Sequence, residues 1–531
     1  MKKALYLILI LGIFISSVNY GQETEIYKGL QAINTDVIKA QLGFLASDWM
    51  EGREAGKRGE LLASDYIASM LQLYGVKPCG DFTLLRSPEG IVNARSYFQN
   101  FVILKTTPGK NNYMQVKSKN GDAVRTTDFI SDVDFTMRQV SYPVEIEAPV
   151  VFVGYGFRND KIEYNDLIKS DLKGKLVLKI NGFPASAEKL LSLSEINQSI
   201  MESEKLIREA GALGIIEFSP SKLVAGNPLN REFLNASPAE GNILPPGSDE
   251  RYSLPGSGIP TEFLRISISA RAAEEILKGT GITINEYIKN ADSNSQAVSL
   301  PPVSKTISLK NEVLISQVPV RNVIGIVEGE ISDEIIVVGA HYDHMGISNG
   351  YIWNGADDNG SGTVGVLTLA KALMATGVKP KKTIIFALWT AEEKGLLGSR
   401  YYVRNTSFPV KNISLNINFD MIGRYISDKN RNGVVMTYNS SHNYFRKITE
   451  DNLKKYDIDL KVDFQPSEDP PGGTDHRSFV EVGVPIMRFK PGHREEYHTP
   501  YDEVSTIDWD IMEKIIRISF ANLWVLANAS W

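Results

Sequence analysis

The chain has 531 residues, of which 43% are hydrophobic and 23% are charged, and its formal net charge is −6. This length exceeds what one hydrophobic core organises, so we expect two or three domains. Acidic and basic residues are interspersed, and the small negative charge gives no reason to expect a nucleic-acid partner.

The first 21 residues have the three regions of a secretory signal peptide. Two lysines precede an apolar run over residues 4–15, and small and polar residues follow up to Gly21. We therefore expect residues 1–21 to be removed on export and the mature protein to be periplasmic or secreted. The apolar run is too short for a membrane span, and no later segment is long and apolar enough to form one. Cys79 is the only cysteine, which excludes an internal disulfide.

Two helices are predicted between residues 34 and 81. The second, at about residues 59–73, has apolar side chains at helical spacing, and Gly75 ends it. The loop between them, residues 45–56, is dense in glycine and charged residues. It is either a helix–helix connector or the rim of a functional site, and the sequence does not decide between the two.

The character of the sequence changes near residue 145. Strands are predicted at 148–157, 172–180, 214–218 and 264–269, and a helix at 202–212. The segments 182–200 and 219–258 between them are predicted to be loops. Residues 292–302 are typical of a linker. We expect residues 145–300 to form a smaller mixed α/β domain inserted into a larger one, whose two parts are residues 22–144 and 301–531.

Strands and helices alternate after residue 300, which predicts an α/β fold with a mixed, mainly parallel sheet sandwiched by helices. Strands are predicted at residues 304–315, 321–328, 334–340, 383–390, 414–419, 433–438, 458–464 and 484–489. Helices are predicted at residues 363–375, 441–455, 476–482 and 506–528.

Three of these strands lead into side chains that bind metals, namely His341, Glu393 and Asp420. Asp357, on a glycine-rich turn, and His498, on a late loop, add two more. Open α/β sheets bind ligands at the carboxyl ends of their strands, so we expect these groups to meet there. Two histidines and three carboxylates suit two zinc ions that share one carboxylate. Singly, each residue has a simpler explanation, since an Asp after glycine often only caps a turn.

The order and spacing of these residues resemble the motif series of the co-catalytic zinc exopeptidases, a family that includes bacterial leucyl aminopeptidases and the glutamate carboxypeptidase II group. The motifs are His341-x-Asp343, Gly355-Ala-Asp-Asp-Asn-Gly-Ser-Gly362, Glu392-Glu393-x-Gly395, Asn418-Phe-Asp420 and Tyr497-His498-Thr499. The resemblance covers residues 300–531. Residues 36–80 are similar to the amino-terminal segment of the family, and residues 145–300 resemble its protease-associated domain.

The resemblance implies a two-zinc site and a role for each ligand. One Zn²⁺ would be held by His341 and Asp420 and the other by Glu393 and His498, with Asp357 bridging them. Glu392 would be the general base that takes a proton from water and returns it to the leaving amine.

Four further residues receive supporting roles. Asp343 is expected to hold the His341 ring. Asp358 matches the family position after the bridging residue, where the peptide bond is often cis. His476 is expected to support the substrate pocket, and Asp502 either steadies His498 or forms a turn.

The expected function is that of an exported di-zinc aminopeptidase acting on peptides. A carboxypeptidase or dipeptidase of the same family stays open, although the basic residues near His498, which are Arg488, Lys490 and Arg494, form no decisive cluster. A glutaminyl-cyclase-like transferase with one working zinc and a peptidase-like binding protein are two minor alternatives. Side-chain specificity and oligomeric state have no signal in the sequence.

Overall fold

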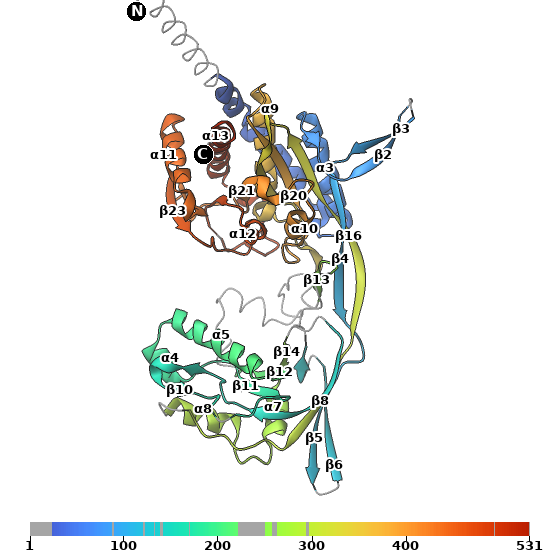
Figure 1. Cartoon of the computed structure of the whole chain (residues 1–531), viewed down its shortest axis with the longest axis vertical. Helices are drawn as coiled ribbons and strands as arrows, with labels where there is room; N and C mark the ends of the chain where they lie inside the picture. The colour runs from blue at the N-terminus through green and yellow to red at the C-terminus, as the bar shows by residue number, and fades with distance from the viewer. Residues whose placement is uncertain are drawn as a thin grey trace, which may run out of the picture. The chain divides into compact units, whose positions relative to one another are not determined.

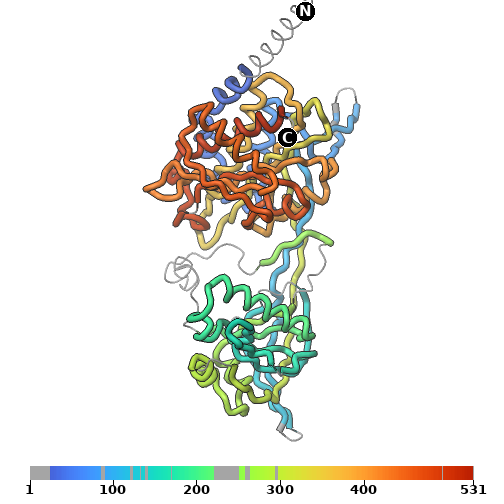
Figure 2. Tube along the Cα trace, turned by 60° about the vertical axis from the view of Figure 1, so that its left-hand side comes forward, coloured from blue at the N-terminus to red at the C-terminus, as the bar shows by residue number. Residues whose placement is uncertain are grey.

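The computed structural model describes residues 24–87, 90–120, 123–131, 133–137, 142–168, 170–220, 250–256, 263–293, 297–492 and 494–529. The chain folds into two compact units (Figures 1 and 2). Among the described residues, the first unit runs up to residue 103 and resumes at residue 317, and the second comprises those from 104 to 316. The predicted signal peptide, residues 1–21, lies outside the described residues. None of the helices in the described part of the chain has the length and hydropathy needed to cross a bilayer.

Two helices of the first unit lie between residues 34 and 81, as predicted. α2 (Thr35–Leu45) starts at Asn34, whose side-chain oxygen accepts the backbone N–H of Asp36 at 2.8 Å and so satisfies a free helix donor. α3 (Arg58–Leu73) matches the predicted helix to within one residue. The short helix η1 (Asp48–Arg53) lies between them and has a positive φ at three of its residues, Glu51, Gly52 and Arg53.

The sheet of the first unit is mixed, as predicted; its central strands are parallel, but antiparallel pairs flank them on both sides, so it is not mainly parallel. Of the ten strands that this sheet has in the described residues, seven neighbouring ones run in the order β16 (Val313–Val327), β20 (Lys382–Trp389), β17 (Ile331–His341), β21 (Ile413–Phe419), β24 (Ile486–Lys490), β22 (Gly433–Asn439) and β23 (Lys461–Ser467). β17 is parallel to both β20 and β21, and β21 is parallel to β24. The predicted break between residues 315 and 321 is absent, because β16 is one strand whose residues 314–317 are exposed and tolerate polar side chains.

Helices cover both faces of this sheet (Figure 1). Ile336 and Val338 of β17 belong to a core shared with α2, α3, α9 (Gly362–Ala375) and α13 (Trp509–Asn528). Ile335 and Val337, which point the other way, pack in a core with α10 (Leu397–Asn405) and α12 (His476–Val480). A strand buried on both faces explains the unbroken apolar run in the sequence.

The second unit has its own mixed sheet. The strand order is β6 (Ala123–Phe129), β5 (Tyr113–Asn120), β15 (Lys305–Asn311), β8 (Val144–Phe152), β11 (Leu176–Ile180), β12 (Gly214–Phe218), β14 (Leu264–Ile268) and β7 (Phe135–Thr136). Its helices include α4 (Ala185–Leu190), α5 (Leu193–Glu209), α7 (Ala270–Leu277) and α8 (Ile284–Ser293). The resemblance of residues 145–300 to protease-associated domains stays a prediction.

The boundaries of the second unit differ from the predicted 145–300. β15 pairs with both β5 and β8, so residues on either side of the predicted limits belong to one sheet. Helices α4 and α5 also occupy much of residues 182–200, which we predicted to be a loop. The start of α5 carries a capping box in which Ser192 and Glu195 each bind the other's backbone N–H, and this is a local signal that the sequence contains.

Candidate metal centre and active site

Three parallel strands deliver the predicted ligands to one edge of the first unit's sheet. β17 ends at His341, which pairs with Trp389 at the end of β20, and a tight loop after Trp389 carries Glu392 and Glu393. Asp420 follows the last residue of β21. Because the strands are parallel, their carboxyl ends lie at the same edge, and the four side chains come together there.

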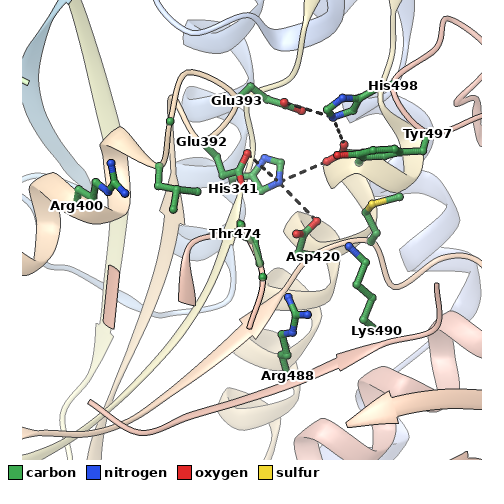
Figure 3. A pocket seen from close by; sticks show the side chains of 16 residues that line it. His341, Glu392, Glu393, Arg400, Asp420, Thr474, Arg488, Lys490, Tyr497 and His498 are labelled. Atoms are coloured by element: carbon green, nitrogen blue, oxygen red, sulfur yellow. Dashed lines mark ion pairs between the residues drawn. The ribbon is translucent and has the colours of Figure 1, made fainter. Parts of the chain in front are cut away.

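Asp358 lies between the two histidines of this cluster. Its Oδ1 is 3.4 Å from His341 Nε2, and its Oδ2 is 3.1 Å from His498 Nε2. On either side, Asp420 Oδ1 is 3.7 Å from His341 Nε2, and Glu393 Oε2 is 3.5 Å from His498 Nε2 (Figure 3). One carboxylate is therefore shared between a His341–Asp420 pair and a Glu393–His498 pair.

Asp358, and not Asp357, occupies the shared position, which corrects the prediction from the sequence. The Asp357 carboxylate belongs to neither group of candidate ligands nor to the pocket lining, and its Oδ1 accepts the backbone N–H of Gly423 at 2.7 Å and the hydroxyl of Ser361 at 3.1 Å. Consecutive side chains on a turn point in different directions, and Asp-Asp-Asn has no periodicity that identifies the inward one. The peptide bond between Asp358 and Asn359 is cis.

The donor set fits divalent metal. Two groups of three residues have ligand atoms within 4.8 Å of one another, namely His341, Asp358 and Asp420, and His344, Asp358 and Glu393. Imidazole nitrogens and carboxylate oxygens are ligands that zinc prefers. Several carboxylates gathered in a buried place also need positive charge beside them, since burying unpaired charge is costly. The residues present therefore fit a pair of zinc ions.

The two adjacent glutamates have different environments. Burial, with the neighbouring Glu393, Asp475 and Asp420 charges, raises the pKa of Glu392 well above its ordinary value, although His341 acts in the opposite direction. Burial acts on Glu393 in the same sense, but His498 and His344 outweigh it and hold the pKa of Glu393 well below its ordinary value. The two histidines thus favour the ionised form of Glu393. For Glu392, burial and the neighbouring negative charges favour the protonated form, and His341 opposes them.

His344 is a site residue that the sequence analysis did not assign. It is fully buried, and its Nδ1 lies 2.9 Å from Glu393 Oε1, so it orients the Glu393 carboxylate or joins it in holding an ion. The available signal was its position three residues after His341, immediately past the end of a buried strand.

Two buried aspartates hold the ligand-bearing loops by their backbones. The Asp343 carboxylate accepts the N–H of Glu392 at 3.0 Å and of Glu393 at 3.4 Å, while the backbone oxygen of Asp343 lies 3.2 Å from His341 Nδ1. Asp343 therefore contacts the His341 ring through its backbone carbonyl oxygen. Its carboxylate is farther from the ring, with Oδ1 3.8 Å from His341 Nδ1.

Asp502 acts on the loop of the shared carboxylate. Its two oxygens accept the backbone N–H groups of Asp357, at 2.9 and 3.1 Å, and of Asp358, at 2.9 Å. The sequence analysis left open whether Asp502 steadies His498 or forms a turn, and the structure places its carboxylate contacts on the backbone of Asp357 and Asp358 instead. These bonds fix the backbone from which the Asp358 side chain reaches both histidines.

A pocket of about 570 Å³ opens onto the cluster. Besides His341, Asp358, Glu392, Glu393, Asp420 and His498, it is lined by Gly395, Leu396, Arg400, Met421, Gly472, Gly473, Thr474, Arg488, Lys490 and Tyr497 (Figure 3). The Tyr497 ring stacks on the His498 ring with centroids 3.8 Å apart. His476 does not line this pocket; it is buried behind it, with Nε2 3.2 Å from the Pro471 carbonyl oxygen.

Comparison with known proteins gives the same assignment for this part of the chain. Residues 322–523 match the model described as peptidase family M28, which confirms the predicted resemblance over that segment. Leucine aminopeptidase 2 of Trichophyton rubrum is 34% identical over 166 residues, which are 31% of this chain and 32% of that protein. The match thus spans about a third of that relative's length.

Two further similarities extend over more of the chain. The glutamate carboxypeptidase 2 homolog of Caenorhabditis elegans is 25% identical over 490 residues, covering 77% of this chain and 58% of that protein. The structure of an aminopeptidase from Aneurinibacillus sp. strain AM-1 superimposes with a TM-score of 0.53 at 17% identity and covers 95% of this chain and 97% of that one. At this identity the likeness is one of fold.

Single substitutions of Asp357 and Asp358 test which of the two carboxylates is shared between the two metal positions. We expect Asp358→Asn to weaken zinc binding by at least 10- to 100-fold, the range seen when even an outer partner of a metal ligand is lost. Asp357→Asn keeps the side-chain oxygen that binds Gly423 and is expected to retain wild-type zinc affinity. Titration of the zinc-free proteins against a chromophoric chelator measures both. A larger loss of zinc affinity in Asp357→Asn than in Asp358→Asn would contradict the assignment and show that Asp357 is the shared carboxylate.

Proposed function

We propose that this chain is an exported di-zinc aminopeptidase, which removes amino-terminal residues from peptides, and the match of residues 322–523 to the model of peptidase family M28 supports the proposal. The observation that carries the proposal is the position of Asp358 between His341 and His498, in the same pocket as Glu392. The leucine aminopeptidase names of relatives support the choice of the amino-terminal end of the substrate.

Five residues would hold two zinc ions: His341 and Asp420 one, Glu393 and His498 the other, with Asp358 shared. When bound, zinc would act as a Lewis acid that polarises the substrate carbonyl and lowers the pKa of water towards neutrality. The protein supplies a fixed donor set, because Asp343 and Asp502 hold the backbones of Glu393 and Asp358.

Glu392 is the proposed general base. It lines the pocket, its Oε2 lies 4.0 Å from His341 Nε2, and its backbone N–H is held by Asp343. In the proposed reaction Glu392 accepts a proton from the attacking water and returns it to the nitrogen of the leaving amine. A carboxylate oxygen of the cluster would accept a hydrogen bond from the free ammonium group of a peptide, which favours an unblocked amino terminus.

One observation favours a second candidate, a carboxypeptidase or dipeptidase of the same family. Arg488 and Lys490, both on β24, line the pocket that contains the cluster. Arg488 Nε is buried and has no hydrogen-bond partner among the described residues. Cationic groups in this position could receive a substrate carboxylate, because a guanidinium pairs well with a carboxylate.

Export is part of the proposal and is supported by the features of residues 1–21. Mass analysis of the protein recovered from the periplasm or medium of producing cells would show a chain that lacks these residues. An intact amino terminus in the cytoplasm would contradict export.

Glu392→Gln tests the assigned base together with the metal. We expect kcat to fall by about 10²- to 10⁴-fold, because the amide cannot accept the proton, while the zinc content stays unchanged. Chelation should abolish wild-type activity and zinc should restore it. Glu450→Gln, at a surface glutamate of α11 (Tyr444–Lys455) that pairs with Arg446, is the matched control and should keep full activity.

The substrates of this assay separate the two candidates. Amino-acid anilides and unblocked dipeptides are compared with amino-blocked peptides that end in Asp or Glu. Zinc-dependent cleavage confined to free amino termini supports the aminopeptidase. Cleavage of the blocked acidic peptides alone would replace it with the carboxypeptidase, and no turnover of either class by the zinc-loaded protein would contradict both.

A further inference from the structure

Arg53, the last residue of η1, is fully buried. Its side chain is 1% exposed, and its hydrogen bonds end on backbone carbonyl oxygens. Burial lowers the pKa of Arg53 to about 10, so the guanidinium stays charged at neutral pH, and negative charges at Asp502, Asp343 and Asp358 act on it. A buried guanidinium normally pairs with a carboxylate, and here backbone oxygens take that place.

Three of the four carbonyl groups that Arg53 binds belong to the two loops that carry the predicted metal ligands. Arg53 Nε donates to Tyr342 O at 2.8 Å, next to His341 in the sequence. Arg53 Nη1 donates to Asn354 O at 2.7 Å, and Nη2 donates to Gly355 O at 2.8 Å, three residues before Asp358. The guanidinium thus joins the loop of His341 to the loop of the shared carboxylate.

The backbone of Arg53 adds a third attachment. Its carbonyl oxygen accepts the N–H of His344 at 3.1 Å, and His344 is the residue whose ring contacts Glu393. Arg53 Nη1 also donates to Leu45 O at 2.6 Å, at the end of α2. Arg53 therefore links the end of α2 and the amino-terminal segment to both loops of the site.

The segment that presents Arg53 has little freedom to move. A Cβ atom at Gly52 would lie 2.4 Å from Gly346 O and 2.6 Å from Trp353 O, and the φ of Gly52 is +65°, where glycine is favoured. A Cβ atom at Gly59 would lie 1.8 Å from Met50 O. Close backbone packing on both sides holds Arg53 in one place.

We infer that Arg53 is a positioning residue that sets the spacing of the His341 and Asp358 loops and thereby the affinity of the metal centre. The inference rests on the proposed zinc centre. It assigns a role to residues 45–56, for which the sequence left a connector and a site rim equally open. Arg53 contacts neither ligand side chains nor the pocket and acts through the backbone of both loops.

Whether zinc affinity rises or falls when the Arg53 guanidinium is removed distinguishes a positioning role from an effect of its charge. Arg53 is a cation near a site for cations, so its charge alone opposes zinc binding, and removing the charge would strengthen binding. If positioning dominates, losing the guanidinium weakens binding instead. Lysine keeps the charge but has three donors on one nitrogen, which cannot reach four carbonyl groups arranged around a planar fork.

The test compares Arg53→Lys and Arg53→Met with wild type and with Arg517→Lys. Arg517 is a matched control, because it also donates to carbonyls of the amino-terminal segment, Leu30 O at 3.1 Å and Ile33 O at 3.4 Å, but from α13. Each zinc-free full-length protein is titrated with zinc against a chromophoric chelator, and its thermal unfolding and peptidase activity are recorded separately.

We expect both Arg53 variants to lose about 10- to 100-fold in zinc affinity, while Arg517→Lys retains wild-type affinity. Unchanged affinity in Arg53→Lys with tighter binding in Arg53→Met would mean that only charge matters and would overturn the inference. Equal zinc affinity in wild type and both variants, with lower thermal stability alone, would reduce Arg53 to a structural role and also overturn it.

Gly52→Ala is a second variant that tests the inference if the Arg53 variants do not fold. Its added methyl group must displace the segment while the guanidinium remains, so zinc affinity should again fall, and wild-type affinity would overturn the inference. The measurements on the wild-type protein show whether a negative result concerns the inference about Arg53 or the proposed function. Failure of the wild type to bind zinc contradicts the metal centre, and zinc binding without peptide hydrolysis contradicts the activity while leaving the affinity comparison intact.

Discussion

The mutual repulsion of carboxylates at one buried sheet edge is the constraint on which the site depends. Asp358, Glu392, Glu393 and Asp420 lie within a few ångströms of His341 and His498 at the carboxyl ends of parallel strands. In a medium of low polarity such charges repel strongly, and cations offset the repulsion once they bind. Until then the fold itself must hold the side chains in place.

The structure meets this constraint through the backbone. The carboxylates of Asp343 and Asp502 accept N–H groups of the ligand-bearing loops, and the guanidinium of Arg53 donates to carbonyl groups of the same loops. These contacts leave the ligand side chains free to bind metal, because none of them occupies a ligand atom. The two buried cores of the sheet supply the rigid strands from which the loops extend.

The sequence predicted the features that arise from local patterns. Apolar runs identified β17 and β20, residues 414–419 were predicted as the strand that is β21, and the polar residues at the strand ends identified His341, Glu393 and Asp420. The same reasoning failed where the outcome depends on one turn, because Asp357 and Asp358 differ only in the direction that the backbone gives them. His344 and Arg53 were missed for a related reason: their partners are 49 residues away at Glu393 and 289 residues away at Tyr342. Strand pairing between β5, β15 and β8 is equally distant in the sequence, and it moved the limits of the second unit.

The central claim is that two ions share Asp358. Diffraction from crystals of the zinc-loaded protein, collected at the zinc absorption edge, tests it most directly. Two anomalous peaks are predicted, one beside His341 and Asp420 and one beside Glu393 and His498, each about 2.0–2.2 Å from an Asp358 oxygen. A single peak, or a pair of peaks bridged by Asp357, would contradict the account.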